Sequence, residues 1–330
     1  MVEPTRLIKP AFSNALTDGV RTSLSRFAVP LIALILFATY SFVIPDIFFT
    51  WGNVRAMLNS QAIVLLLALA TTIPVRAGDL DFSPAAVMTG SGATLAASFA
   101  AGVPWQFSVM LSLAFGLAVG AIHAFFIVKV GVDAFVMTLG SLIALGGYAY
   151  LVTGSRVLVD VPQEIIAFST TPLFGMPLAT WYGWILIFIV WYVYEKTPVG
   201  RYLLFTGGSR EAARLAGVRV PLVRTLALFS SALICSFAGI VLVGQFASLD
   251  PSIGPSYLLQ PATAVFLGAT TIQVGRYNAW GTVFALYLLV IGVTGLQLLG
   301  ATQWLNSVFN GVALVIAITV ARIAQKRHAS

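Results

Sequence analysis

The chain has 330 residues, of which 59% are hydrophobic and 9% charged, whereas a soluble domain is typically about 25% charged. This composition excludes an ordinary soluble domain and indicates that the lipid bilayer is the solvent of the chain. The formal net charge is +7, but the basic residues flank apolar runs instead of gathering on one solvated face, so no nucleic-acid partner is predicted.

Long uncharged runs between charged clusters mark candidate membrane spans. The run from Phe82 to Val128 has 47 residues, which as one helix would reach about 70 Å against a hydrocarbon core of about 30 Å. It must cross twice, with a break at 101–104, and the 45-residue run from Tyr277 to Ala321 must break near Gly300. The ten predicted spans cover residues 27–45, 57–75, 84–101, 105–128, 134–153, 179–194, 225–246, 257–272, 279–299 and 304–321. The predicted fold is therefore all-α, a polytopic membrane protein of about ten transmembrane helices.

The first 26 residues are polar, and the apolar stretch that follows lacks the small-residue cleavage pattern of a signal peptide, so we expect an uncleaved first span. With the N-terminus inside, ten spans place 16 of the 18 Lys and Arg on the inner side and leave only Arg55 and Arg156 outside. Both termini are therefore predicted to be cytoplasmic. The chain divides into a cytoplasmic segment 1–26, one transmembrane domain 27–321 with a cytoplasmic loop 195–223, and a cytoplasmic tail 322–330.

Ten spans also allow an inverted repeat, in which spans 2 to 5 and spans 7 to 10 run in opposite directions. One sequence echo supports the repeat, since Leu80-Asp81-Phe82-Ser83-Pro84 is similar to Leu249-Asp250-Pro251-Ser252. Within span 4, Gly116 and Gly120 have the spacing that lets two helices pack closely. The longest external segment, 155–178, is interpreted as a lid or docking loop, and the longest internal one, 195–223, as a contact surface.

Ionisable groups at membrane depth, which hold the coupling ion in secondary transporters, are nearly absent. His123 lies in span 4, six residues before Lys129 at the inner end, so a packed histidine is favoured over a proton relay. The sequence lacks a Gly-x-x-x-x-Gly-Lys-Ser/Thr phosphate loop, so the chain cannot be its own ATPase by that route. Cys235 is the only cysteine, and no catalytic residue, metal site or cofactor is predicted.

The internal loop contains a short predicted helix with both ends marked. Ser209 suits the N-cap, Glu211 places a carboxylate near the positive helix end, and Gly217 suits the stop about two turns later. Helical spacing gives this helix an apolar face and a basic face, formed by Ala212, Leu215 and Ala216 and by Arg210 and Arg214. Such a helix could rest on the lipid interface or fit a cleft in a cytoplasmic partner.

This loop, from Thr197 to Val218, resembles the conserved cytoplasmic loop of bacterial permeases for ribose and related monosaccharides, in the wider ribose and branched-chain amino acid permease family. The resemblance covers nearly the whole chain, from residues 45–53 to Trp304 and Gly311. It implies that 27–321 is a permease domain and that the short helix is a coupling helix, which docks on an ATPase subunit. The coupling residues so implied are Ser209, Arg210, Glu211, Ala212, Arg214, Leu215, Ala216 and Gly217.

The resemblance further implies a permease subunit of an ABC importer in the bacterial inner membrane, which translocates a ribose-like monosaccharide or a related polyol. ATP would be hydrolysed on a separate ABC ATPase subunit, so the chain itself would not be an enzyme. A periplasmic solute-binding protein would deliver the sugar, and a second permease subunit, identical or a sibling, would complete the pore. Three alternatives stay open: an ion-gradient-driven carrier, a permease for branched-chain amino acids or nucleosides, and a non-transporting membrane scaffold.

Two segments of the chain differ from the pattern of such permeases. Relatives usually carry a Gly-Gly-Ile-Asp-Leu-Ser run after span 2, where this chain has Ala77-Gly78-Asp79-Leu80-Asp81-Phe82-Ser83-Pro84. Here Ser83 can cap the next helix and Pro84 suits its first position. After span 8, where relatives have a glycine-rich turn, this chain departs at Gln273, Val274 and Tyr277.

Neutral amides within the spans could line a solute channel or could bond neighbouring helices. Gln245, Gln260 and Gln297 are open to both interpretations. The predicted solute-path residues are Gln61, Asp79, Asp81, Ser83, Gln303, Asn306 and Asn310, of which the last three share one helix face.

Overall fold

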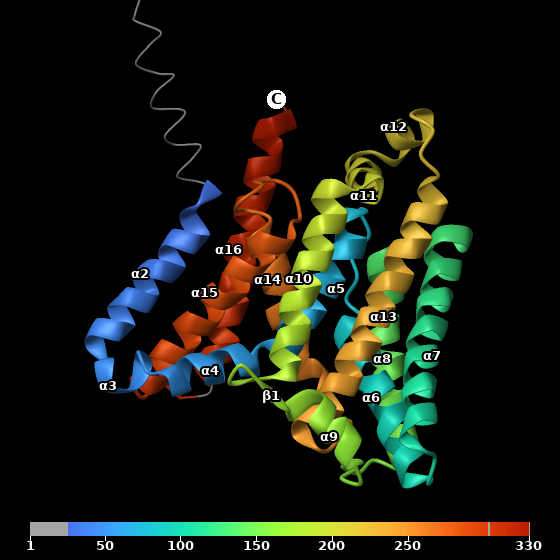
Figure 1. Cartoon of the computed structure of the whole chain (residues 1–330). Coiled ribbons are helices and arrows are strands. Elements are labelled where there is room, and N and C mark those ends of the chain that lie inside the picture. Colours follow the sequence, from blue (N-terminus) through green and yellow to red (C-terminus); the bar gives the residue numbers. More distant parts are fainter. Residues whose placement is uncertain (1–25, 303, 330) are drawn as a thin grey trace, which may run out of the picture.

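The computed structural model describes residues 26–302 and 304–329, which form a bundle of helices (Figure 1). The predicted segment 1–26 therefore lies outside the described residues except for Arg26, and so does Gln303. The helices of the first half are α2 (Ala28–Val43), α3 (Pro45–Phe48), α4 (Trp51–Ser60), α5 (Ala62–Arg76), α6 (Pro84–Ala100), α7 (Trp105–Ala124), the π-helix η1 (Phe125–Val130), α8 (Ala134–Thr153) and α9 (Gln163–Thr170). Those of the second half are α10 (Leu178–Lys196), α11 (Pro198–Gly208), α12 (Arg210–Leu215), α13 (Val220–Phe246), the 3₁₀ helix η2 (Gly254–Tyr257), α14 (Leu259–Gly268), α15 (Ala279–Leu298) and α16 (Trp304–Ala329).

The strands of the described residues, β1 (Pro172–Leu173) and β2 (Met176–Pro177), form one small antiparallel hairpin. The predicted all-α membrane fold is confirmed. Among the described residues, five helices are long and apolar enough to cross a bilayer, namely α7 with η1, α8, α10, α13 and α15. Helices α4 and α5 meet at a bend of 43° and give a sixth if they are taken as one span.

The predicted span 304–321 lies within α16, which has 26 residues, whereas the remaining predicted spans are shorter helices. Helices α2 and α6 have 16 and 17 residues, and the predicted span 257–272 is an α-helix only over the ten residues of α14. A helix this short can stand at membrane depth because protein surrounds it: α14 packs against α5, α15 and α16. The predicted breaks lie where expected, at Gly102 and Gly300, whose positive φ angles of 76° and 95° suit glycine.

The two ends of the bundle differ. The start of α2, the end of α16, and helices α11 and α12 lie at one end, whereas α3, α4, α9 and the β-hairpin lie at the other (Figure 1). We call the first the coupling end and the second the distal end. The predicted lid segment 155–178, which contains α9 and the hairpin, is joined to the segment that follows α13 by paired backbone hydrogen bonds between Leu158 and Leu249.

Helix packing follows the predicted inverted repeat. Helix α6 packs against α7, α8 and α13, and its counterpart α14 packs against α15, α16 and α5. The counterparts in the repeat are α5 and α13, α6 and α14, α7 and α15, and α8 and α16. When every helix is replaced by its counterpart, the neighbours of α6 become the neighbours of α14. Gly116 and Gly120 serve the packing of α7, since an added side chain at either would meet α13 at Ser236 or Ala232.

The two Asp-x-Ser turns of the repeat have the same hydrogen bonds. Asp81 Oδ1 accepts from Ser83 N at 2.9 Å and from Ser83 Oγ at 2.6 Å, and Asp250 Oδ1 accepts from Ser252 N at 2.8 Å and Ser252 Oγ at 2.7 Å. The predicted capping of α6 by Ser83 is wrong, because the hydroxyl donates to Asp81 instead of accepting from the helix. Pro84 does begin α6, as predicted.

Candidate functional site

The loop after α10 forms two helices, and the first of them, α11, was not predicted. Thr197 stands before α11 and Pro198 is its first residue, a position that suits proline because the missing N–H would be unpaired there anyway. At Gly200 the chain passes so close to the backbone of Val193 and Tyr194 that a side chain would collide with it. Helix α11 is thus held against the end of α10.

Helix α12 has the ends that the sequence indicates. Ser209 Oγ accepts from Ala212 N at 3.3 Å, and Glu211 lies in the first turn. At the other end Gly217 has a φ of 82°, and Val218 N donates to Ala213 O at 3.0 Å. This closing bond satisfies a carbonyl at the helix end, so both ends of a helix of only six residues are fixed.

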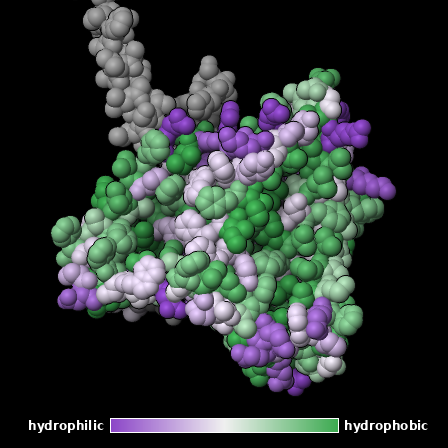
Figure 2. Space-filling model, viewed as in Figure 1, coloured by the Kyte–Doolittle hydropathy of each residue, from purple (hydrophilic) through white to green (hydrophobic). Residues whose placement is uncertain are grey.

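One side of α12 faces the protein and the other faces away from it. Ala213 is buried, whereas the side chain of Leu215 is 82% exposed and Ala212 and Ala216 are exposed too. The Arg214 and Glu211 side chains approach each other at 3.6 Å on the surface, a contact that contributes little in water. The coupling end is rimmed by hydrophilic residues, and apolar residues stand at the tip that carries α12 (Figure 2). The apolar face of α12 is therefore available to a partner.

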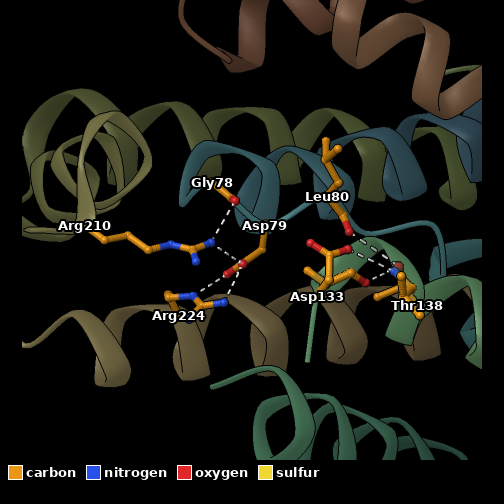
Figure 3. A network of polar contacts seen from close by, with 9 residues as sticks. Gly78, Asp79, Leu80, Asp133, Thr138, Arg210 and Arg224 are labelled. Atoms are coloured by element: carbon orange, nitrogen blue, oxygen red, sulfur yellow. Dashed lines mark hydrogen bonds and ion pairs between the residues drawn. The ribbon is translucent and has the colours of Figure 1, made fainter. Parts of the chain in front are cut away.

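A buried carboxylate joins α12 to the rest of the bundle (Figure 3). Asp79, in the turn between α5 and α6, has a side chain only 1% exposed. Arg224 of α13 donates from Nε to Oδ2 at 2.7 Å and from Nη2 to Oδ1 at 2.6 Å, a bidentate pair. Arg210 of α12 donates from Nη2 to Oδ1 at 2.8 Å and to the carbonyl of Gly78 at 3.1 Å. We call Asp79, Arg210 and Arg224 the arginine clamp.

The two arginines of the clamp have different surroundings. The Arg224 side chain is 11% exposed and that of Arg210 is 48% exposed. Because Arg224 alone supplies both carboxylate oxygens with donors, Arg210 is the second, solvent-exposed partner. A hollow of about 350 Å³ lies beside the clamp and is also lined by Asp133 and by the backbone around Gly131.

Backbone contacts reinforce the clamp. Gly207, near the end of α11, lies so close to the carbonyl of Arg76 that a side chain there would collide with it. Gly78, with a φ of 86°, lies against Gly207. The turn after α5 is therefore in contact with both helices of the loop.

A second arginine site lies at the end of α5. The guanidinium of Arg76 donates to the carbonyl of Tyr277 at 2.7 Å and stands 4.2 Å from the ring centroid of Tyr194. The Tyr194 hydroxyl shares a hydrogen bond of 2.8 Å with Thr72 Oγ1. These contacts thus connect α5, α10 and the segment before α15 at the coupling end.

The predicted solute-path residues do not meet in one place. Asp79 belongs to the clamp, and Asp81 and Ser83 form the adjacent turn. Gln61 lies at the bend between α4 and α5, towards the distal end. Asn310 is buried in α16, and of Asn306 only the helical backbone is described. His123 shares a hydrogen bond of 2.7 Å with Ser141, which agrees with a packed histidine.

Sequence reasoning missed the clamp. Asp79 and Arg224 are 145 residues apart, and no local pattern pairs them. One signal was present: at Asp79 this chain has a carboxylate where the family run reads glycine, and an extra acidic residue at a span boundary calls for a cation.

A bundle of apolar spans with an internal repeat and a fixed helix pair at one end is the architecture of a polytopic membrane protein. A sequence model of the family described as "Branched-chain amino acid transport system / permease component" matches residues 53–318. The chain belongs to this family.

Individual relatives agree with this assignment. The chain is 29% identical over 292 residues to the ribose import permease protein of Escherichia coli strain K12, which covers 87% of this chain and 90% of that protein. It is 30% identical over 285 residues to the autoinducer 2 import system permease protein of Photorhabdus luminescens, with 84% and 85% covered. The chain is thus an ABC importer permease of the sugar-transport type, a membrane subunit whose family implies an ATPase subunit and a solute-binding protein as partners.

Proposed function

We propose that this permease imports a ribose-like monosaccharide or a related polyol, driven by ATP hydrolysis on a separate subunit that docks on α12. The observation that carries the proposal is the two-sidedness of α12: Ala213 anchors the helix while Leu215, 82% exposed, points away from the protein. Ala212 and Ala216 are exposed beside Leu215, so the outward face of α12 is apolar and offers a partner a surface to bury.

The arginine clamp gives a path by which movement of α12 reaches the spans. Arg210 belongs to α12, Asp79 to the turn between α5 and α6, and Arg224 to the start of α13. A pull on α12 therefore acts on both halves of the repeat at once, because α5 and α6 belong to one half and α13 to the other. The ATPase would hydrolyse ATP, and this chain would transmit the resulting movement from α12 to its membrane-spanning helices.

The orientation follows from the charges. The coupling end holds the basic loop and both ends of the described chain (Figure 1), and we place it in the cytoplasm of a bacterial cell, with both termini. The distal end, with α9 and the β-hairpin, then faces the periplasm and is the surface on which a solute-binding protein would release its sugar. A second permease subunit, identical or a sibling, would form the other half of the pore.

A sugar is proposed as cargo because the relatives are named for ribose and autoinducer 2 import, while the family description leaves branched-chain amino acids as the alternative. An ion-gradient-driven carrier is less favoured, because the clamp neutralises Asp79 and so removes a carboxylate that could hold a coupling ion.

Uptake into proteoliposomes tests the proposal. The complex of this chain with its ATPase and solute-binding protein is reconstituted, and labelled D-ribose, D-xylose and L-leucine are offered in parallel. We expect a pentose to accumulate only with ATP, and ionophores that collapse proton and sodium gradients to leave uptake unchanged. Uptake of leucine alone would favour the amino acid alternative, and uptake driven by a gradient without ATP would overturn the proposal.

A further inference from the structure

Four amide side chains from three separate segments gather where α4 bends into α5. Gln260 Nε2, in the first turn of α14, donates to Gln61 Oε1 at 2.9 Å. Gln245 Nε2, near the end of α13, donates to the carbonyl of Asn59 at 3.4 Å. All four residues are half-buried. We call Asn59, Gln61, Gln245 and Gln260 the amide cluster.

The cluster holds acceptors that are prepared for a ligand. Asn59 Oδ1 and Gln245 Oε1 are buried, and among the described residues neither receives a hydrogen bond. A buried acceptor without a donor destabilises the folded protein, so such groups are rare unless they have another role. A solute with hydroxyl donors would satisfy both oxygens.

Three helices bend, end or begin near the amide cluster. The helix axis turns by 43° at Gln61, α13 ends at Phe246, and α14 begins at Leu259. Helices that end or bend inside a transporter leave backbone and side-chain polar groups available to a solute, whereas continuous helices pair all of theirs internally.

The composition of the cluster selects the ligand. Amides both donate and accept, and they carry no charge, which suits a molecule with several hydroxyls. An amino acid would bring a carboxylate and an ammonium group, and charged groups are costly to desolvate without opposite charges. The hydrogen bonds that join the cluster are all between uncharged groups.

From this geometry we propose that the amide cluster is a weak binding site for a neutral polyhydroxylated solute, on the distal side of the bundle. Its amide-to-amide bonds open to admit the solute, whose hydroxyls then pair with Gln61, Gln260 and the two unpaired oxygens. The ligand identity rests on the proposed function, since the ligand would be the imported sugar.

Saturation-transfer NMR on the full chain in lipid nanodiscs tests the site directly, with a probe mixture of D-ribose, D-xylose, ribitol and L-leucine. We expect transfer from the wild type to the pentoses or ribitol and none to leucine. In Gln61→Leu/Gln260→Leu the transfer falls by about fivefold or more, as loss of hydrogen bonds to the solute requires. Gln297→Leu is the matched control, because Gln297 is an exposed amide at the last turn of α15 outside the cluster.

A second variant separates binding from folding. Gln245→Met removes the buried unpaired oxygen together with the long 3.4 Å donation from Nε2 to the Asn59 carbonyl, and these two changes oppose each other in stability. A cluster with a merely structural role predicts no change in transfer. Our proposal predicts reduced transfer in a variant that is as stable as the wild type. Equal transfer in both cluster variants and the wild type, transfer to leucine alone, or no transfer to any probe would overturn it. Co-purification of the ATPase, measured on the same preparations, reports on the proposed function separately, so the two failures are distinguishable.

Discussion

The arginine clamp makes a quantitative prediction about its two ion pairs. Asp79 and Arg224 are 1% and 11% exposed, so removing the carboxylate leaves Arg224 buried without a partner, and removing Arg224 leaves Asp79 only its contact with the exposed Arg210. Breaking a buried pair in this way typically costs about 3–5 kcal/mol. Arg210 is 48% exposed, and a solvent-screened pair is worth about 0–1 kcal/mol. Although both arginines touch the same oxygen of Asp79, we expect them to differ several-fold in their contribution to stability.

Two double-mutant cycles measure the difference. The first combines Asp79→Asn with Arg224→Met and the second combines Asp79→Asn with Arg210→Met, and the unfolding free energy is measured by denaturant titration of the purified permease in detergent micelles. We expect a coupling energy above about 2 kcal/mol in the first cycle and below about 1 kcal/mol in the second. Equal coupling energies, or an Asp79→Asn variant as stable as the wild type, would refute the reasoning.

Three further predictions follow from the coupling end and the repeat. Arg210→Met should leave the permease folded but reduce ATP-driven uptake, because α12 loses its ionic link to Asp79, and uptake at the wild-type rate would contradict this role. Gly207→Ala should lower the unfolding free energy by about 1–3 kcal/mol, because the added methyl group would collide with the Arg76 carbonyl. Gly208→Ala is the control and should not lower it, because the space beside Gly208 is open. Equal effects of the two substitutions would contradict the close contact at Gly207. In the Asp250–Ser252 turn, hydrogen bonds from Ser252 lower the pKa of Asp250 below the ordinary aspartate value. The contribution of these bonds to the free energy of unfolding is therefore fully present at a pH above the ordinary aspartate pKa, and it is lost as the pH falls through the lowered pKa of Asp250. Ser252→Ala should raise that pKa, and an unchanged carboxyl titration by NMR would show that the hydroxyl has no part in it.

Helix positions could be predicted from the sequence because the bilayer imposes length and apolarity on each span. Residues 134–153 were predicted as a span and form α8, and the breaks at Gly102 and Gly300 could be placed because two crossings need a turn between them. The short helix at 209–217 could be predicted because Ser209 and Gly217 act within one or two turns of their own positions.

What could not be predicted depends on contacts between distant segments. Helix α14 is shorter than its apolar run because neighbouring helices, not lipid, surround it, and apolarity alone does not distinguish the two. The apolar face of α12 was placed correctly at Leu215, but the sequence did not show that Ala213 would be the buried residue. The pairs Asp79–Arg224 and Gln61–Gln260 join residues 145 and 199 positions apart, so only the fold brings them together.

The central claim is that an ATPase subunit docks on α12, and affinity purification of the tagged permease from its native membrane tests it most directly. Leu215→Asp places a charge on the exposed apolar face, and Glu211→Arg reverses the charge of the first turn. Phe174→Asp is the matched control, because Phe174 is 83% exposed, like Leu215 at 82%, but lies in the hairpin at the distal end. We expect an ATPase subunit to co-purify with the wild type and with Phe174→Asp and to be lost from Leu215→Asp and Glu211→Arg. An ATPase retained by both α12 variants, or absent from the wild type, would contradict the account.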